Sequence, residues 1–207
     1  PGELSTCSPT PATWRVYACY RLRLGKCMQV IETPRMILRK PELSDLEPLF
    51  QIHADPATNR YNPAGPVSDR ETFQQELKTW IEHHEKYGFG YYVIIDKSDS
   101  GYVGVCGLKH IFIQEQRYLN LYYRITPEKM RRGYVKEAAR AIIDTVLQDD
   151  GSDRAGEAEC PSPQSRIVVA LTLNTNLPSI RTAISLGLKH YPGLDDYEGD
   201  GNVYYFN

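Results

Sequence analysis

A long helix entered through a basic, glycine-containing loop constrains the fold more than any other feature of this sequence. Between residues 135 and 147 the apolar side chains recur at helical spacing and form one continuous stripe. The loop before it carries Arg131, Arg132 and Gly133, and a run with strand character, residues 118–125, precedes the loop. Backbone N–H groups at such a turn, together with the positive end of the helix dipole, bind anions. The pattern predicts a phosphate-binding turn, although an ordinary buried helix that uses glycine for backbone freedom has the same appearance.

A second strand-to-helix unit lies near the C-terminus. Residues 166–173 form a continuous apolar run rich in β-branched side chains, which predicts a buried strand. The helix expected after it begins at Asn176, carries Pro178 in its first turn and ends at Gly187. Ser179 also lies in that first turn, so Asn176 and Ser179 both have an ordinary role in satisfying helix N–H groups.

Together these units resemble the GNAT superfamily of acetyl-CoA-dependent N-acetyltransferases, in particular its RimJ/RimL-like branch of ribosomal-protein N-terminal acetyltransferases. That branch reads Thr-Pro/Glu-Arg-Leu-x-Leu-Arg near its start, matched by residues 33–39. Its middle reads Pro-Glu, then Gly-Tyr and Glu-Ala, matched by residues 127–138. Asn-x-x-Ser and Leu-Gly-Phe follow, matched by residues 176–179 and 186–188. The resemblance covers residues 28–207.

The resemblance implies an α/β fold with a mixed, mostly antiparallel central sheet and helices on both faces. It also implies a V-shaped splay between two central strands, residues 118–125 and 167–173. Acetyl-CoA is the implied cosubstrate, with its pantetheine arm against Ile125 and Thr126 and a further contact at Asn176. The residues that would hold its pyrophosphate are Met130, Arg131, Arg132, Gly133, Tyr134, Val135 and Lys136.

Departures from the family pattern concern the chemistry. Relatives have glycine where this chain has Arg131, and glycine or alanine at Val135, so the phosphates could be crowded while Arg131 adds charge. Met130 replaces glutamine, arginine or an aromatic residue. Asn120 lines up with a glutamate that is a common general base in the family. The resemblance therefore implies that Asn120 lies on the substrate side of the site and that the base is missing there. By resemblance, Ser179 hydrogen-bonds the leaving sulfur.

The implied reaction is attack of a neutral primary amine on the thioester. A lysine-like amine with a pKa near 10.4 costs about 4.6 kcal/mol to deprotonate at pH 7, whereas an α-amino group with a pKa near 8 costs about 1.4 kcal/mol. A site without a strong base therefore favours a peptide or protein N-terminal α-amino group. Glu115 and His110 are alternative bases, and an acidic segment, residues 195–200, is an alternative attraction for a cationic amine.

An alternative of a different class is a catalytically silent acyl-CoA-binding or regulatory module on the same fold. The residues at 120, 130 and 135 favour it, because each departs from the pattern of active relatives. No dinucleotide-binding glycine fingerprint, P-loop, nucleophile elbow or zinc-protease motif offers a competing active site.

Composition narrows the class of protein. Lys and Arg number 24 against 26 Asp and Glu, a net charge of −2, so the chain lacks the basic footprint of a nucleic-acid binder. Its five cysteines are scattered, which argues against a disulfide framework or a structural zinc site. No apolar run approaches the roughly 18 residues that span a bilayer. We expect a cytoplasmic enzyme without metal, whose acceptor is a small-molecule amine or a peptide N-terminus, and leave homodimer formation open.

We divide the chain into an N-terminal arm, residues 1–27, and one acetyltransferase domain, residues 28–207. The arm is basic and is expected to be weakly ordered or to add an edge strand, with the natural start at Met28. A polar segment rich in Pro, Gly and Ser, residues 149–165, is expected to be a mobile insertion.

Within the domain, capping residues predict two early helices. The first is expected to be capped by Ser44, and the second to begin with a capping box at Ser68 and to end at Gly88. The expected strands before the central pair are residues 35–40, 90–96 and 102–113, and those at the C-terminus are 189–191 and 203–206.

Overall fold

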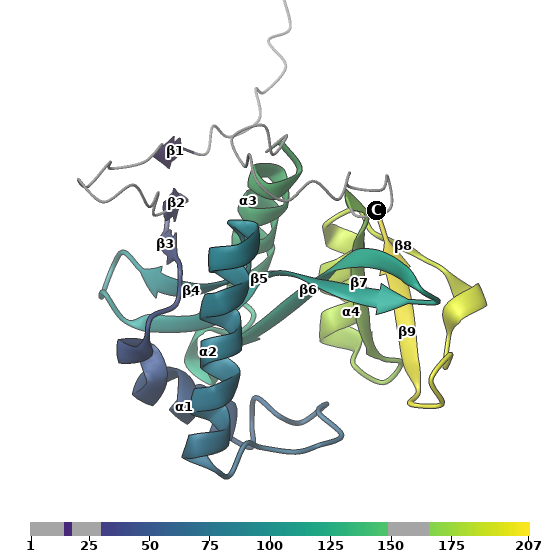
Figure 1. Cartoon of the computed structure of the whole chain (residues 1–207), viewed down its shortest axis with the longest axis horizontal. Coiled ribbons are helices and arrows are strands. Elements are labelled where there is room, and N and C mark those ends of the chain that lie inside the picture. Colours follow the sequence, from purple (N-terminus) through teal and green to yellow (C-terminus); the bar gives the residue numbers. More distant parts are fainter. Residues whose placement is uncertain (1–14, 18–29, 149–165) are drawn as a thin grey trace, which may run out of the picture.

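The computed structural model describes residues 15–17, 30–148 and 166–207 (Figure 1). These residues form a nine-stranded sheet in the order β1-β2-β3-β4-β5-β6-β7-β9-β8. The pair β6 and β7 is parallel and the other neighbours are antiparallel. The fold is therefore α/β with a mixed, mostly antiparallel sheet, as the resemblance implied. The insertion expected at 149–165 lies outside the described residues.

The elements match the sequence expectations closely in the second half of the chain. The strands are β1 Arg15–Tyr17, β2 Val30–Glu32, β3 Met36–Arg39, β4 Tyr91–Asp96, β5 Tyr102–Ile113, β6 Gln116–Ile125, β7 Val168–Leu173, β8 Lys189–His190 and β9 Asn202–Phe206. The helices are α1 Leu46–Ala54, α2 Arg70–Tyr87, α3 Tyr134–Gln148 and α4 Leu177–Ser185, with 3-10 turns at Leu43–Asp45, Pro127–Lys129 and Pro192–Leu194. The short strand β2 was not predicted; it pairs with β1 and β3.

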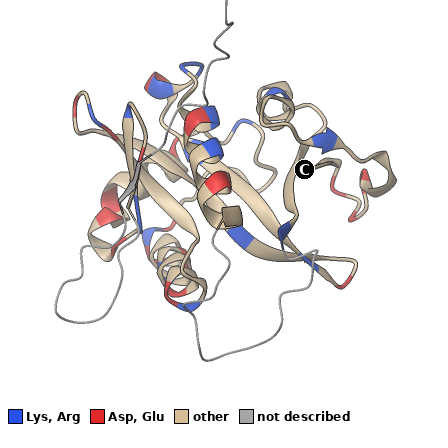
Figure 2. Ribbon diagram, turned by 90° about the horizontal axis from the view of Figure 1, so that it is seen from above, with Lys and Arg blue, Asp and Glu red and all other residues tan. Residues whose placement is uncertain are grey.

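Helices cover both faces of the sheet, α1 and α2 on one and α3 and α4 on the other (Figure 1). Strand β6 shows why, because its side chains alternate between the faces. Leu119, Leu121 and Ile125 pack in the core beneath α3, whereas Tyr122 packs against residues of α1 and α2. We call these two sides the α3 face and the α2 face of β6. Charged residues of both signs are distributed over the elements (Figure 2).

Two helix starts differ from the sequence expectations. Helix α2 begins at Arg70 and its cap is Asp69, whose carboxylate accepts hydrogen bonds from the N–H groups of Glu71 and Thr72, so the prediction of Ser68 was wrong. An ionised carboxylate is the stronger acceptor of backbone N–H groups. Helix α1 follows a 3-10 turn that contains Ser44, so Ser44 is not its cap either. The expected end of α2 is confirmed, because Gly88 has a left-handed φ of 73°.

The splay between the two central strands is confirmed by their register. Only two pairs join β6 to β7, Leu119 with Val168 and Asn120 with Val169. Beyond Asn120, β6 continues to Ile125 in full antiparallel pairing with β5, and no described strand pairs with its other edge. The separation leaves backbone groups of β6 and β7 facing each other without strand pairing.

Candidate active site

The loop that enters α3 has the geometry of an anion-binding turn. Arg131 and Gly133 both have positive φ, 59° and 78°, and the first helical turn follows directly. Because the first N–H groups of an α-helix have no acceptor within it, those of Tyr134, Val135 and Lys136 are available to a ligand. The side chains of Arg131, Arg132 and Lys136 are exposed beside them. This donor set suits the charge of a pyrophosphate.

The positive φ of Arg131, 59°, is a backbone conformation that glycine adopts more readily than arginine. A left-handed backbone costs a residue with a Cβ about 1–2 kcal/mol, and glycine avoids that cost. Arg131 therefore adds an exposed cation to the turn and has a less favourable backbone conformation than glycine would have.

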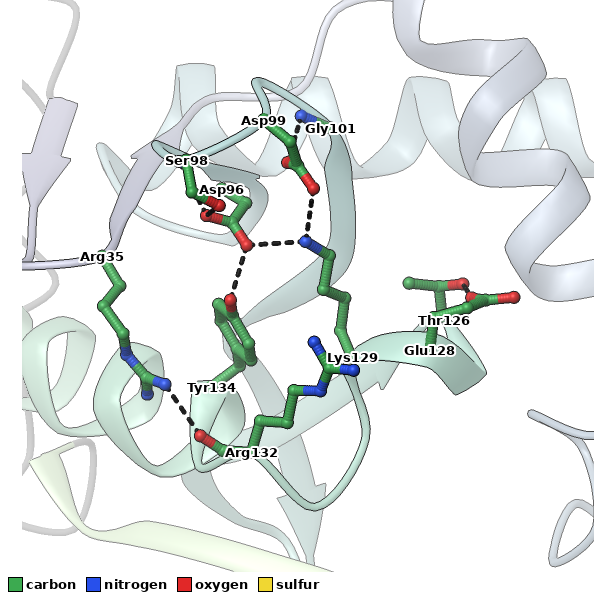
Figure 3. Close-up of polar contacts among 10 residues, drawn as sticks. All are labelled: Arg35, Asp96, Ser98, Asp99, Gly101, Thr126, Glu128, Lys129, Arg132 and Tyr134. Atoms are coloured by element: carbon green, nitrogen blue, oxygen red, sulfur yellow. Dashed lines mark hydrogen bonds and ion pairs between the residues drawn. The ribbon is translucent and has the colours of Figure 1, made fainter.

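The buried carboxylate of Asp96 anchors the loop that enters α3 (Figure 3). Asp96, at the end of β4, accepts hydrogen bonds from the Tyr134 hydroxyl at 2.5 Å and from the Lys129 ammonium at 2.7 Å. Lys129 also contacts the Asp99 carboxylate at 2.7 Å. The hydrogen bond from Lys129, followed by that from Tyr134, holds the pKa of Asp96 well below its usual range. The same contacts raise the pKa of Lys129 and of Tyr134.

This arrangement refines the list of expected cofactor contacts. The Tyr134 side chain points inward, is 7% exposed and anchors the loop, so what it presents to a phosphate is its backbone N–H. The charge of Lys129 is likewise already paired with two carboxylates.

Arg35 is a residue of this region that the sequence did not single out, although it belongs to the matched motif at 33–39. Its Nε donates to Glu137 at 2.7 Å. Its Nη1 donates to the carbonyl oxygen of Arg132 at 2.8 Å (Figure 3). Its guanidinium also lies over the Tyr134 ring, 4.4 Å from the centroid. Arg35, which directly precedes β3, thus connects that strand to the loop and to the first turn of α3. Tertiary proximity across 102 positions carries no local sequence signal.

The backbone of β6 beyond Asn120 faces the splay at alternate residues. The N–H of Leu119 donates to the carbonyl of Ile167 at 2.9 Å, so the backbone groups of Leu121, Tyr123 and Ile125 have the same direction. The backbone N–H of Ile125 therefore faces the splay, and its contact with pantetheine stays a prediction. The N–H of Thr126, in contrast, donates to the carbonyl of Val103 at 2.8 Å and is already used.

Ser179 lies in a hydroxyl pair that the sequence did not indicate. The hydroxyl groups of Ser179 and Tyr123 are 2.6 Å apart, and either can donate to the other. Burial raises the pKa of Tyr123. Tyr204 and Tyr205 on β9, in contrast, are packed in the core. Alternation of burial along β6 is the signal that would have favoured Tyr123, since it places that side chain on the same face as α4.

Asn176 caps α4, as its position predicts. Its side-chain oxygen accepts a hydrogen bond from the Ser179 N–H at 3.3 Å, and its amide donates to the Thr172 hydroxyl at 3.0 Å. The capping role is confirmed, and the cofactor contact of Asn176 stays a prediction.

Asn120 lies on the α2 face of β6, at the last residue paired with β7. Its side-chain oxygen is buried without a hydrogen-bond partner among the described residues. Burial raises the pKa of the neighbouring Tyr91, and a hydrogen bond from the Asn120 side chain partly opposes that rise. Tyr122 completes this group, with its ring centroid 5.0 Å from that of Tyr91.

The surroundings of His110 and Glu115 do not favour either residue as the general base. Burial lowers the pKa of His110 to about 4, and its ring packs against Tyr87 and Phe89. Glu115 is exposed at the tip of the β5–β6 hairpin with a φ of 64°. In the acidic segment, Asp195 pairs with His190, and the side chains of Asp196 and Asp200 accept backbone N–H groups of their own loop.

Neither a metal-binding cluster nor a membrane-spanning helix is found among the residues that the structure describes. Within 15–17, 30–148 and 166–207, no group of three or more His, Cys, Asp or Glu side chains is arranged to hold a metal ion. In the same part of the chain, no helix has the length and apolar character to cross a membrane.

Comparison with known proteins agrees with the fold. The family model described as "Acetyltransferase (GNAT) domain" matches residues 35–189. The chain is 32% identical over 161 residues to the uncharacterized protein YkkB of Bacillus subtilis (strain 168), covering 77% of this chain and 84% of YkkB. It is 25% identical over 171 residues to the uncharacterized N-acetyltransferase p20 of Bacillus licheniformis, covering 83% of this chain and 88% of p20.

Among solved structures, the ribosomal L7/L12 α-N-protein acetyltransferase RimL, in complex with coenzyme A, superposes with a TM-score of 0.65 at 15% identity. The match covers 86% of this chain and 97% of that one. The fold, the family match and the relatives agree, and the chain belongs to the GNAT acetyltransferase family, whose members use acetyl-CoA.

Proposed function

We propose that this protein transfers the acetyl group of acetyl-CoA to a primary amine, with the α-amino group of a peptide or protein N-terminus as the favoured acceptor. The observation that carries the proposal is the separation of β6 from β7 beyond Asn120, directly ahead of the anion-binding turn at Gly133. Acetyl-CoA supplies the acetyl group and the thiolate that leaves. Cations at Arg131, Arg132 and Lys136 and the first N–H groups of α3 suit its pyrophosphate.

The residues that line the splay can stabilise the developing oxyanion and protonate the leaving thiolate. As the C–N bond forms and the C–S bond breaks, charge develops on the carbonyl oxygen, and the backbone N–H of Ile125 can stabilise it. Such a donor is typically worth roughly 3 kcal/mol. The leaving thiolate needs a proton, which the Ser179 hydroxyl can donate while it recovers one from Tyr123 at 2.6 Å. We infer that Tyr123 and Ser179 act as a pair.

The absence of a carboxylate at Asn120 supports an α-amino acceptor. An α-amino group loses its proton at pH 7 for about 1.4 kcal/mol, so water can serve as the proton acceptor, whereas a lysine side chain needs about 4.6 kcal/mol. Among the structural neighbours, RimL is named as an α-N-protein acetyltransferase, and a Vibrio fischeri protein is named as a ribosomal-protein-S5-alanine acetyltransferase. Their names agree with this choice of acceptor.

Two matched peptides test the proposal. One has a free N-terminus and blocked lysines, and the other has a blocked N-terminus and one free lysine. We expect thiol release from acetyl-CoA to be faster with the first peptide. Faster acetylation of the lysine peptide would contradict the α-amino acceptor. Binding of acetyl-CoA without thiol release across a panel of amines would favour the catalytically silent acyl-CoA-binding module instead.

A further inference from the structure

We propose that Arg124 binds a carboxylate of the acceptor, so that the favoured substrates are amines that carry an acidic group close to the reacting nitrogen. The inference deepens the proposed function and rests on it. It names a chemical feature of the acceptor that the fold alone does not define.

The position of Arg124 is the first step. It is the penultimate residue of β6, next to Ile125, in the part of the strand that has no pairing with β7. Because side chains alternate along a strand, Arg124 shares the α2 face with Asn120 and Tyr122. It therefore lies on the same side as the residue that replaces the family's general base, and beside the proposed oxyanion donor.

The contacts of Arg124 are the second step. Its Nε donates to the Tyr122 hydroxyl at 3.0 Å, and its Nη1 donates to the carbonyl of Thr58 at 3.3 Å and to the side-chain oxygen of Asn59. All three acceptors are neutral. Among the described residues its Nη2 has no recorded partner, and the side chain is half-buried. A guanidinium has five N–H donors in a planar fork that suits a carboxylate.

Other arginines of the fold show the contrast. Arg39 is similarly half-buried, yet its two terminal nitrogens bind the two oxygens of Asp45 at 2.8 and 2.6 Å. Arg35 pairs with Glu137 at 2.7 Å. The protein thus supplies a carboxylate to each of these guanidinium groups but supplies only neutral oxygens to Arg124. A guanidinium without a carboxylate partner in the protein can form a charge-assisted pair with the carboxylate of a ligand.

The charges that face Arg124 agree with an anionic ligand. Glu76 of α2 is the nearby acid: burial raises its pKa, while attraction to Lys109 and Arg124 opposes that rise. It makes no recorded ion pair with either cation within the described part of the chain. Lys109 lies opposite Asn120 on β5. Among the described residues, Glu76 thus interacts with two cations, Lys109 and Arg124, and an acceptor with one carboxylate and one amine matches that balance.

The competing explanation is that Arg124 only ties the loop at 55–66 to the sheet, through Thr58 and Asn59. A structural tie predicts loss of stability on mutation without a change in the choice of acceptor. Recognition of a carboxylate predicts a change in the choice of acceptor, and the charge of the guanidinium is then essential.

The test uses two dipeptide amides with the same free N-terminus, seryl-aspartate amide and seryl-asparagine amide. We expect wild-type kcat/KM to be at least about tenfold higher for the aspartate peptide, the typical worth of one charge-assisted hydrogen bond. Arg124→Gln keeps a donor for the loop and removes the charge, so the preference should vanish. Arg124→Lys should restore part of it. The matched control is Arg117→Gln on the opposite face of the same strand, which should retain the full preference.

A thermal-unfolding shift with acetyl-CoA, measured for every variant, separates the two levels of failure. No shift and no turnover in the wild type would contradict the proposed function itself. A normal shift with equal kcat/KM for the two peptides, or with a preference that survives Arg124→Gln, would overturn the role of Arg124. Turnover of neither peptide by a protein that binds acetyl-CoA would also overturn it.

Discussion

The start of α3 and the α2 face of β6 differ in how their polar groups are satisfied. At α3, Asp96, Lys129, Arg35 and Glu137 form ion pairs of 2.7 Å, and the Tyr134 hydroxyl joins them. On the α2 face, Arg124 has neutral partners and the side-chain oxygen of Asn120 has none among the described residues. Buried polar groups are generally hydrogen-bonded, so each exception calls for an explanation, and at Asn120 we propose that the explanation is the acceptor. The side chains of the first region are thus paired with one another, and the second region is where we propose that the acceptor binds.

The two regions should respond to acid at different pH values, and this is the largest effect we expect. Burial lowers the pKa of His53 and of His84, in the α1–α2 layer, to about 4. An unfolded histidine titrates near 6.5, so the unfolded chain takes up these protons first. Stability is therefore complete above about pH 6.5 and falls as the pH drops towards 4, by up to about 3 kcal/mol for each histidine.

Asp96 behaves differently, because its pKa is lowered in the folded protein. Its contribution is present above the unfolded pKa, near 3.9, and decreases only as the pH falls below that value. Urea unfolding at pH 7, 5.5 and 4.5 should show a steep decrease in the free energy of unfolding, which arises from protonation of the histidines. His53→Gln should flatten the dependence, and a wild-type stability that is constant over this range would contradict it.

The hydroxyl pair on the α3 face should give the largest effect on turnover. Ser179→Ala should lower kcat about 100-fold with little change in the KM for acetyl-CoA, since proton donation acts in the transition state. Tyr123→Phe should lower kcat by a similar factor. Because the two groups share one hydrogen bond, the double variant should resemble either single variant. Multiplied losses in the double variant would show that the two residues act separately.

Removing the carboxylate behind the loop should weaken cofactor binding. Asp96→Asn leaves Lys129 and Tyr134 without their shared ionic partner, so the loop shifts and the Kd for acetyl-CoA should rise roughly tenfold. Asp99→Asn is the matched control. It removes the more exposed carboxylate of the same lysine, and exposed ion pairs contribute little. Equal losses in the two variants by isothermal calorimetry would contradict the anchoring role of Asp96.

Arg131→Gly should give the smallest effect, with opposite signs for stability and binding. Glycine relieves the left-handed backbone at φ 59°, for a gain of about 1 kcal/mol or a melting temperature higher by about 2–4 °C. Loss of the exposed cation should weaken acetyl-CoA binding a few-fold. Arg132→Gly, at a position without positive φ, should bring no gain in stability. A destabilised Arg131→Gly variant would show that its charge, rather than its backbone, dominates.

The parts of the molecule that the sequence predicts well are those set by local patterns. The stripe of α3, the Asn176 cap of α4 and the glycine end of α2 each depend on residues within a few positions, and each is confirmed. The choice of Asp69 over Ser68 as a cap is also local, but two adjacent candidates compete and the difference in acceptor strength decides.

The contacts that complete the site depend on distant segments. Arg35 and Glu137 are 102 positions apart, and Tyr123 meets Ser179 across 56 positions. Neither contact is indicated by a periodicity or a motif in the sequence. The segments become neighbours only through the order of the strands in the sheet. The family resemblance supplied the position of Ser179 but not its partner.

Thermal unfolding with and without acetyl-CoA tests the central claim most directly. At 100 times its Kd, a ligand of the folded state adds about 2.7 kcal/mol, a shift of about 6–10 °C for a chain of this size. We expect acetyl-CoA and CoA to raise the melting temperature by this amount and ATP to leave it unchanged. Absence of a shift with acetyl-CoA would contradict the assignment of the turn at Arg131–Lys136 and the splay beside it as the cofactor site.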